Sequence, residues 1–300
     1  MAAIRPLRTP TSALSAPPGV WTVPFFRIMS KVWGMADSCV GWRLGECVPP
    51  SYLKAMTGTT LTDRAILRIS GDEARPFLQG LLTRDVLTLA EGEPRWTGLL
   101  TPQGKALFDF ILWADGDDVL IDCEAAQADA LAKRLALYRL RRRVTIARED
   151  GLAAHWSLEA RDRPFDPRLP DLGHRWLAAP GDGDAAPAFR VHRLALGVFE
   201  GVGELGQDAV LWLEANAEEL HGVDYDKGCY VGQENTARMH YRSKVNRRLV
   251  AVPLDRADER RQRAALPDLG LSIELRRVEA IDPATAPVWL AAALAAPVAE

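Results

Sequence analysis

The order of apolar patterns between Asp63 and Ala147 is the feature that most constrains the fold. One segment alternates apolar and polar residues as a half-buried strand does, other short apolar segments also have the pattern of strands, and two longer segments repeat apolar residues at the spacing of an amphipathic helix. The strand patterns cover 63–69, 106–114, 118–122 and 143–147, and the helical patterns cover 74–85 and 125–140. Strand, helix, strand, strand, helix, strand is the order of a split βαβ unit. It predicts a mixed α+β domain with its helices on one face of an antiparallel-rich sheet.

The first 55 residues lack this periodicity. Prolines recur through them, and basic residues outnumber acidic ones. An arginine-bearing, acid-poor leader is typical of an organelle transit peptide, and an over-extended gene start is the other interpretation. We expect 1–55 to be a poorly ordered leader or a mis-assigned start, with the folded chain opening near Met56. The main domain is then expected at 56–249 and a shorter C-terminal subdomain at 250–300.

Two later segments carry weaker signals. Residues 161–188 are rich in proline, aspartate and glycine, which predicts a connecting loop or linker, with a second ordered stretch beginning near Phe189. Residues 250–300 contain one strand candidate, Leu271 to Arg277, and an alanine-rich tail.

The composition narrows the class of partner. A 300-residue chain with 48% hydrophobic and 26% charged residues is typical of a soluble globular protein. The formal net charge of -3 argues against direct nucleic-acid binding and against an acidic membrane surface as general partners. No apolar run approaches the ~20 residues of a membrane-spanning helix, so we expect no membrane partner.

The cysteines point to a reducing compartment. Cys39, Cys47, Cys123 and Cys229 form no C-x-x-C pair and fit no common zinc spacing, so no metal site is predicted. They are also too few for a disulfide scaffold. A cytoplasmic location follows, with the mitochondrial matrix as the alternative if the leader is a transit peptide.

The stretch DKGCYVGQE, from Asp226 to Glu234, mixes residue types that neither a core nor an ordinary surface loop requires. Gly228 and Gly232 would allow backbone conformations that a Cβ forbids, which would hold Cys229 on a tight loop. Lys227 places a cation two residues from that thiol, and a neighbouring cation favours a thiolate.

Three other stretches allow two interpretations each. Gly201 to Gly206 matches the G-x-G-x-x-G dinucleotide fingerprint, but without the strand and helix that the fingerprint requires it predicts a plain loop. The basic run Arg139 to Arg143 is either a solvated helix end or an electrostatic docking site for an anion or an RNA backbone. A third cluster could attract an anionic ligand; it consists of Arg238, His240, Arg242, Lys244, Arg247 and Arg248.

These residues carry a family resemblance. The eight residues from Lys227 to Glu234 resemble the K-G-C-Y-x-G-Q-E signature of the YgfZ-type folate-binding proteins. Those proteins are relatives of glycine-cleavage aminomethyltransferase and of the mitochondrial iron–sulfur assembly factor that shares its fold. Flanking stretches that also fit the family are 69–86, 99–109, 138–146, 193–197 and 213–216, so the resemblance covers about residues 58 to 250.

The resemblance implies a fold and a function. The fold is an α+β, aminomethyltransferase (GcvT)-like arrangement, with split βαβ subdomains around a central folate channel and a small C-terminal β subdomain. The function is that of a tetrahydrofolate-binding factor supporting iron–sulfur cluster assembly or maintenance and iron–sulfur enzymes, including radical enzymes that thiolate tRNA. The implied partners are iron–sulfur client enzymes or assembly proteins, with folate as the small molecule and no metal of the protein's own.

The resemblance also assigns roles to single residues. Cys229 and Lys227 are the catalytic candidates, and Gly228 and Gly232 shape the loop. The candidates for holding folate are Gln103, Lys105, Asp109, Arg193, Glu214, Tyr230, Gln233 and Glu234. The alternative for the loop is that it merely closes the folate channel, with Cys229 packed inside.

Three departures from the family concern the chemistry and the end of the chain. Phe108-Asp109 stands where aminomethyltransferases have paired aspartates, and Ala195 stands where they have a glutamate. Losing two carboxylates argues against acid–base help in one-carbon transfer. A non-enzymatic or weakly catalytic folate-dependent factor is therefore favoured over a folate-dependent aminomethyl- or methyltransferase. A cysteine enzyme pairing Cys229 with His240 is a third reading. The third departure is that 250–300 is short, so the family's C-terminal barrel is expected to be reduced or rearranged.

Overall fold

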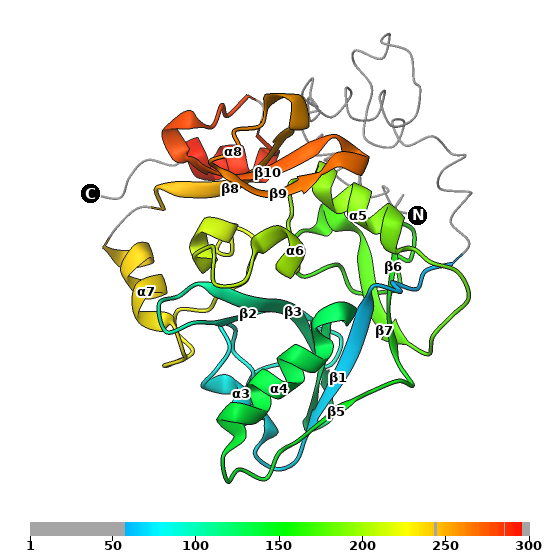
Figure 1. Ribbon diagram of the computed structural model, residues 1–300. Helices are drawn as coiled ribbons and strands as arrows, with labels where there is room; N and C mark the ends of the chain where they lie inside the picture. The colour runs from blue at the N-terminus through cyan, green and yellow to red at the C-terminus, as the bar shows by residue number, and fades with distance from the viewer. Residues whose placement is uncertain (1–57, 243–244, 285, 296–300) are drawn as a thin grey trace, which may run out of the picture.

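A five-stranded antiparallel sheet forms the centre of the protein in the computed structural model, which describes residues 58–242, 245–284 and 286–295 (Figure 1). The predicted leader at 1–55 lies outside the described residues. The strand order is β2-β3-β4-β1-β5. The strands are β1 (Arg64–Ser70), β2 (Arg95–Leu100), β3 (Ala106–Asp115), β4 (Asp118–Glu124) and β5 (Thr145–Arg148).

The split βαβ order predicted from the sequence is confirmed. β1 pairs antiparallel with β4 on one side and β5 on the other, and β3 continues the sheet beyond β4. β2 adds an edge strand that the sequence pattern did not reveal. Its Gly98 packs against Trp212, where a Cβ would lie 3.0 Å from the indole ring. Close packing therefore explains the glycine at this position, although glycine has a low strand propensity.

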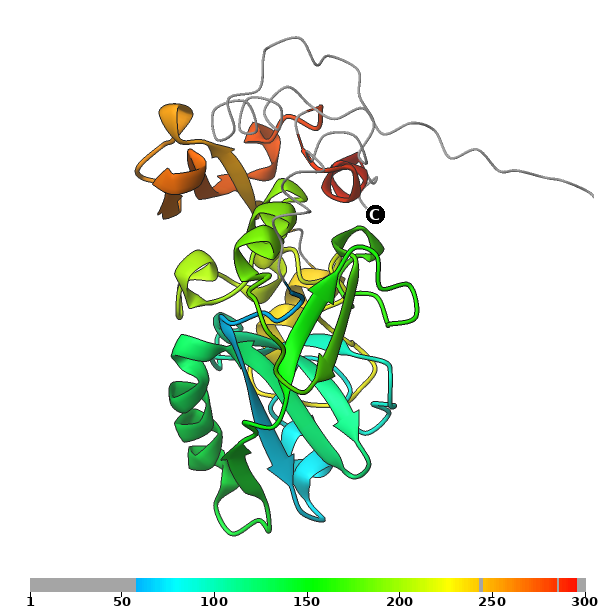
Figure 2. The same cartoon turned by 90° about the vertical axis from the view of Figure 1, so that its right-hand side faces the viewer.

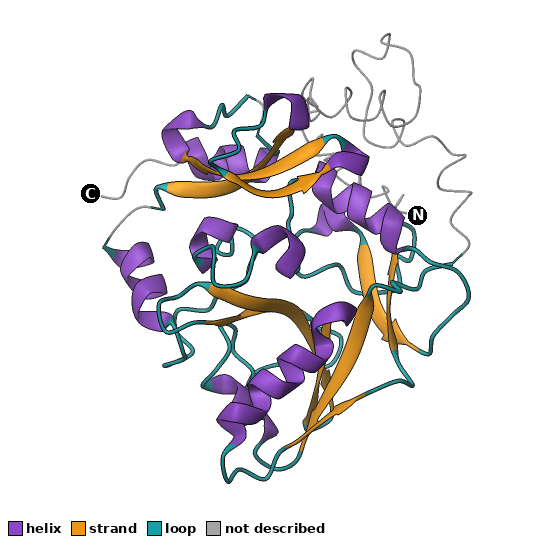
Figure 3. Cartoon of the chain, viewed as in Figure 1, coloured by secondary structure: helices purple, strands orange, loops and turns teal. Residues whose placement is uncertain are grey.

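Both faces of the sheet are buried. Helices α3 (Ala74–Gln79) and α4 (Ala128–Arg139) cover one face, and their core contacts include Phe77 and Leu131. The other face packs against the later part of the chain through residues such as Trp96 and Ile111 (Figures 1 and 3). This second layer explains why β3 is almost continuously apolar, since strands buried on both faces lose their alternation.

The helix following β1 is shorter than predicted. α3 ends at Gln79, and Gly80 begins a turn that carries Leu81 and Leu82 into the core without helical geometry. The predicted helix at 125–140 is a 3₁₀ turn, Ala125–Gln127, followed by α4.

The linker predicted at 161–188 is wrong in its centre. β7 (His174–Ala178) lies there and pairs antiparallel with β6 (Ala153–Ser157). Arg168 and Arg175 are fully buried in this segment, and they satisfy their charge through acidic partners. Arginine is normally a surface residue, so a strand that buries arginine lacks the apolar pattern by which buried strands are recognised. For this reason the sequence did not reveal β7.

The C-terminal part is a three-stranded antiparallel sheet, ordered β8-β10-β9, which lies at the top of Figure 1. The strands are β8 (Arg247–Pro253), β9 (Gln262–Leu266) and β10 (Leu271–Arg277). β10 coincides with the strand predicted there. The sheet is not closed into a barrel, as expected for a reduced subdomain. The predicted domain boundary at 249/250 falls inside β8 and stays a proposal.

Four helices complete the description of the later chain. They are α5 (Ala186–Ala195), α6 (Val202–Leu205), α7 (Gln233–Tyr241) and α8 (Val288–Ala295). No helix in the described part of the chain has the length and apolar character needed to cross a bilayer.

Candidate functional site

The loop from Lys227 to Gly232 leads directly into α7. Gly228 has φ +91°, and Gly232, which precedes the first residue of α7, has φ +87°. Both angles lie where residues with a Cβ rarely go. Cys229 lies between them and is exposed to solvent, so the alternative in which it packs inside the loop does not describe this structure.

The two glycines of the loop face different surroundings. A Cβ at Gly232 would lie 2.5 Å from Thr101 O and 2.9 Å from the Leu100 Cβ, whereas a Cβ at Gly228 would meet nothing within 4 Å. Gly232 therefore fixes the loop against the turn after β2, and Gly228 supplies only a backbone conformation.

We expect Gly232→Ala to lower the free energy of unfolding by about 2 kcal/mol more than Gly228→Ala. Both variants pay about 1–2 kcal/mol for the positive φ, and only the first must also displace packed backbone. Urea unfolding of the two variants measures the difference. Equal losses would show that the loop is not held at Gly232.

Lys227 does not extend into solvent. Its Nζ donates hydrogen bonds to Gln79 O at 2.6 Å and Leu82 O at 2.8 Å, and it lies 4.7 Å from the ring centroid of Tyr230. The carbonyls at and just beyond the C-terminal end of α3 attract a cation there. Burial lowers the pKa of Lys227 to about 8, although Asp85 and Asp224 act in the opposite direction.

This lowered pKa predicts a pH-dependent stability. Between pH 8 and 10.5 the unfolded chain binds a proton at Lys227 that the folded chain has released, so stability rises with pH across this window. Below about pH 8 both states are charged, and the full cost of burying the ammonium remains. We expect the rise to be about 1–3 kcal/mol in the parent chain and to be absent in Lys227→Met. Urea midpoints at the two ends of the window compare them, and identical pH profiles would refute the assignment.

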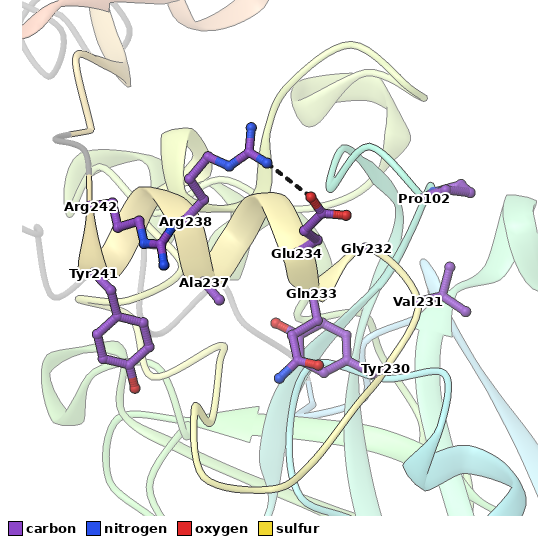
Figure 4. A pocket seen from close by; sticks show the side chains of 10 residues that line it. All are labelled: Pro102, Tyr230, Val231, Gly232, Gln233, Glu234, Ala237, Arg238, Tyr241 and Arg242. Atoms are coloured by element: carbon purple, nitrogen blue, oxygen red, sulfur yellow. Dashed lines mark hydrogen bonds and ion pairs between the residues drawn. The ribbon is translucent and has the colours of Figure 1, made fainter.

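An open cavity of about 810 Å³ lies beside the loop (Figure 4). Tyr230, Gln233 and Glu234 line it, together with residues from the length of α7. Burial raises the pKa of Tyr230 to about 12, so this phenol stays neutral. Glu234 accepts a hydrogen bond from Arg238 one helical turn later, at 2.9 Å.

Gln103 and Lys105 lie on the turn between β2 and β3, which packs against the start of α7. The Asn235 side chain donates to Gln103 O at 3.0 Å, and a Cβ on Gly104 would lie 3.2 Å from Gly232 O. Gln103 is exposed, whereas Lys105 donates to Asp208 O at 3.1 Å. The turn thus brings Pro102 to the cavity lining, which does not include Gln103, and directs the Lys105 ammonium toward Asp208.

Three further predicted folate residues, Asp109, Glu214 and Arg193, are buried and paired with protein groups. Asp109 accepts hydrogen bonds from Trp96 Nε1 at 3.1 Å and Gly201 N at 2.8 Å. Glu214 accepts one from Arg247 Nε at 2.8 Å. Burial raises the pKa of Asp109, and the negative charge of Glu200 adds to the shift. The cavity beside Asp109 measures about 10 Å³, which holds at most one water.

Arg193 belongs to a buried cluster of charged side chains that the sequence did not reveal. We call it the buried ion cluster; its members are Arg64, Asp109, Asp122, Asp166, Arg168, Arg175, Arg193, Glu200 and Glu204. Arg193 donates to both carboxylate oxygens of Glu204, at 2.6 and 2.8 Å. Burial alone would raise the pKa of Glu200, but Arg193, Arg168 and Arg64 hold it well below its usual value. The cluster joins the central sheet to β7, α5 and the segment before α6.

Other candidates from the sequence have local partners. His240 stacks on Tyr225 with ring centroids 3.7 Å apart, and its Nδ1 lies 3.0 Å from Glu218 Oε1. No contact joins His240 to Cys229 in the described residues, so the cysteine–histidine pair gains no support. The glycine-rich stretch at 201–206 contains the four-residue α6, so it is not the plain loop expected. Within the described ranges, no three His, Cys, Asp or Glu side chains are arranged to hold a metal ion.

Comparisons with known proteins identify relatives over most of the described chain. No family model matches. The iron–sulfur cluster assembly factor IBA57, mitochondrial, of Homo sapiens is 34% identical over 231 residues, which cover 64% of this chain and 65% of that protein. The homologue from Neurospora crassa is 31% identical and the alignment covers 64% of this chain and 52% of its length. The chain thus spans about half to two thirds of these curated relatives.

A solved structure supports the fold independently. Glycine cleavage system aminomethyltransferase T from Bartonella henselae superposes with a TM-score of 0.51 at 14% identity, covering 87% of this chain and 91% of the other. This likeness concerns the fold alone. The resemblance found in the sequence is thereby confirmed: the chain is a homologue of the IBA57 iron–sulfur cluster assembly factors and has the fold of the aminomethyltransferases.

Proposed function

We propose that the protein acts in iron–sulfur cluster assembly, with the Cys229 thiol as its reactive group and tetrahydrofolate bound in the adjacent cavity. The names of the relatives support the first part. The observation that carries the proposal is the exposed Cys229, presented between two glycines of positive φ beside an open cavity.

The two cysteines of the described residues differ in what they can do. Burial raises the pKa of Cys123 to about 12, and its Sγ contacts Ala65 O at 3.6 Å, so it stays an inert thiol. Cys229 is exposed, and a thiol in that position is accessible to iron, to another thiol or to a partner protein. These properties suit a factor that transfers or protects cluster components.

The residues around the cavity fit a reduced folate. Its volume falls within the range of small-molecule sites. Gln233 and Glu234 offer amide and carboxylate groups for a pterin edge, and Tyr241 offers a ring face. Arg242 offers a guanidinium to the carboxylates of the glutamate tail. When bound, tetrahydrofolate would supply a reduced pterin that carries one-carbon units.

Not every predicted folate residue reaches this cavity. Lys105, Asp109, Arg193 and Glu214 are engaged by other protein groups. Their roles in holding folate stay predictions, as does the central channel. In this proposal they fix the sheet and the later chain that surround the loop.

The experiment for the proposed function is restoration of iron–sulfur enzyme activity in cells that lack their own assembly factor of this family. Expression of the chain should restore the activity of iron–sulfur enzymes while leaving enzymes without clusters unchanged. Normal protein level with no restoration would contradict the proposal. The relatives' names, which say mitochondrial, favour a mitochondrial location over the predicted cytoplasm. The tRNA-thiolating radical enzymes stay a predicted client class.

The fold favours one alternative, a folate-dependent aminomethyltransferase. The side chains argue against it, because Asp109 is tied to Trp96 and Gly201 and the family's glutamate position holds Ala195. Purified protein incubated with the other glycine-cleavage components separates the two functions. One-carbon transfer above background would establish the transferase.

A further inference from the structure

The turn that follows α4 presents an exposed leucine among arginines. Leu140 is 85% exposed, and Leu137, on the last turn of α4, is 63% exposed. Arg139, Arg141 and Arg142 are exposed on the same turn. We call Leu137, the three arginines and Leu140 the basic tip. In both views it lies at the lower end of the molecule, away from the C-terminal sheet (Figures 1 and 2).

The backbone of the basic tip is strained at its apex. Leu140 has φ +50° and ψ −116°, and Arg142 N donates to Arg139 O at 2.9 Å. These angles and this bond are those of a tight turn whose first central position normally holds glycine. A leucine there costs free energy, and such strain persists only where the surroundings fix it and is concentrated at functional positions.

The surroundings do fix it. Arg143 N donates to Glu73 Oε2 at 2.8 Å, and a Cβ on Gly71 would overlap Arg143 O. Val144 is buried immediately after. The turn is therefore clamped to the start of α3, and the leucine is held outward in one conformation.

The charge of the basic tip is not neutralised from within. Among the described residues, no carboxylate lies within ion-pair distance of Arg139, Arg141 or Arg142. Arg143 has one loose partner, Asp72, at 3.7 Å. Exposed guanidinium groups around an apolar side chain have the anatomy of an interface centre with a charged rim.

We propose that the basic tip is a docking site for an acidic protein surface containing an apolar pocket that accepts Leu140. Nucleic acid is disfavoured, because leucine neither stacks on bases nor hydrogen-bonds to them. A fluid bilayer is disfavoured, because it adapts to any conformation and gains nothing from a backbone fixed in advance. A shaped pocket on a protein gains from both the fixed leucine and the rim of arginines. This inference does not depend on the proposed function, since Cys229 and the folate cavity take no part in it.

The test measures binding of the full chain to two labelled peptides, poly-L-glutamate and an alternating glutamate–leucine peptide, by fluorescence anisotropy. The chain should bind both and prefer the leucine-containing peptide by about tenfold, the value of one buried leucine. Leu140→Ser should remove this preference. The double variant Arg141→Glu, Arg142→Glu should weaken both by about tenfold or more, and Arg260→Glu, an exposed arginine on the C-terminal part, should change neither.

A second readout separates strain from charge. Leu140→Gly should raise the melting temperature by about 1–3 °C while removing the leucine preference. Tighter binding to phosphatidylglycerol vesicles or to poly(U) RNA than to the acidic peptides would overturn the proposal in favour of a membrane or RNA. Equal binding of both peptides by the parent chain, or an unchanged melting temperature in Leu140→Gly, would also overturn it.

Discussion

Cys229→Ser is expected to abolish the support of iron–sulfur enzymes in cells while leaving the protein folded. The side chain is exposed and contributes nothing to the core, so the free energy of unfolding should change by less than about 0.5 kcal/mol. Oxygen replaces sulfur without the metal affinity or redox chemistry of a thiolate. Activity of iron–sulfur enzymes in a deletion strain, measured beside protein level, gives the result directly.

Cys123→Ala is the matched control. Cys123 packs under α4 at 2% exposure, so its loss should cost about 1–2 kcal/mol of stability and leave function intact. The two variants thus predict opposite patterns, one losing function and the other stability. Full complementation by Cys229→Ser would refute a functional role for the thiol and would leave the loop with a structural role only.

Arg168→Met is expected to cost about 3–5 kcal/mol of the free energy of unfolding. Arg168 is fully buried and donates to Asp166 at 2.8 and 2.9 Å and to Glu200 at 2.5 Å. Its removal leaves the carboxylates of Asp166 and Glu200 buried without these hydrogen bonds. Urea unfolding followed by circular dichroism measures the loss.

Arg190→Ala provides the comparison. Arg190 forms an ion pair of similar length, 2.6 Å, with Asp268, but both side chains are partly exposed. Water screens that pair, so its loss should cost at most about 1 kcal/mol. Similar losses for the two arginines would show that burial does not set the strength of the buried ion cluster.

The fold was predictable where apolar residues follow a short, regular pattern. β1 alternates apolar and polar residues, β4 is a short apolar run, and α4 repeats apolar residues at helical spacing, so their order determined the split βαβ unit. The sequence misled where charge is buried. β7 and the approach to α5 look like a polar linker because Arg168, Arg175 and their carboxylate partners occupy core positions. A pairing between residues this far apart has no local signature.

The candidate site was predicted unevenly for a related reason. Tyr230, Gln233 and Glu234 line one cavity beside the loop that carries Cys229, because contiguous residues stay together in any fold, and their functional roles stay predictions. Lys227 was expected to serve the thiol, yet its Nζ is bonded to the carbonyls of Gln79 and Leu82. Whether a side chain turns toward its neighbour or toward a helix end depends on tertiary packing that spacing does not encode.

The basic tip is a second place where the sequence did not reveal a side chain's conformation. The sequence singled out Arg139 to Arg143 by charge alone, with an anion or RNA backbone as its expected partner. The exposure and backbone angles of Leu140 became visible only in three dimensions. They change the preferred partner from a polyanion to an acidic protein surface.

The most direct test of the account is a calorimetric titration of tetrahydrofolate into the purified chain and into Arg242→Glu. The central claim is that the cavity beside the Cys229 loop, which Arg242 lines (Figure 4), holds reduced folate with its anionic tail at Arg242. The parent chain should bind one equivalent, and Arg242→Glu should weaken binding by about tenfold or more, because it replaces attraction by like-charge repulsion. Arg260→Glu should bind as the parent does. Absence of binding up to millimolar tetrahydrofolate, or equal affinity in Arg242→Glu, would contradict the claim.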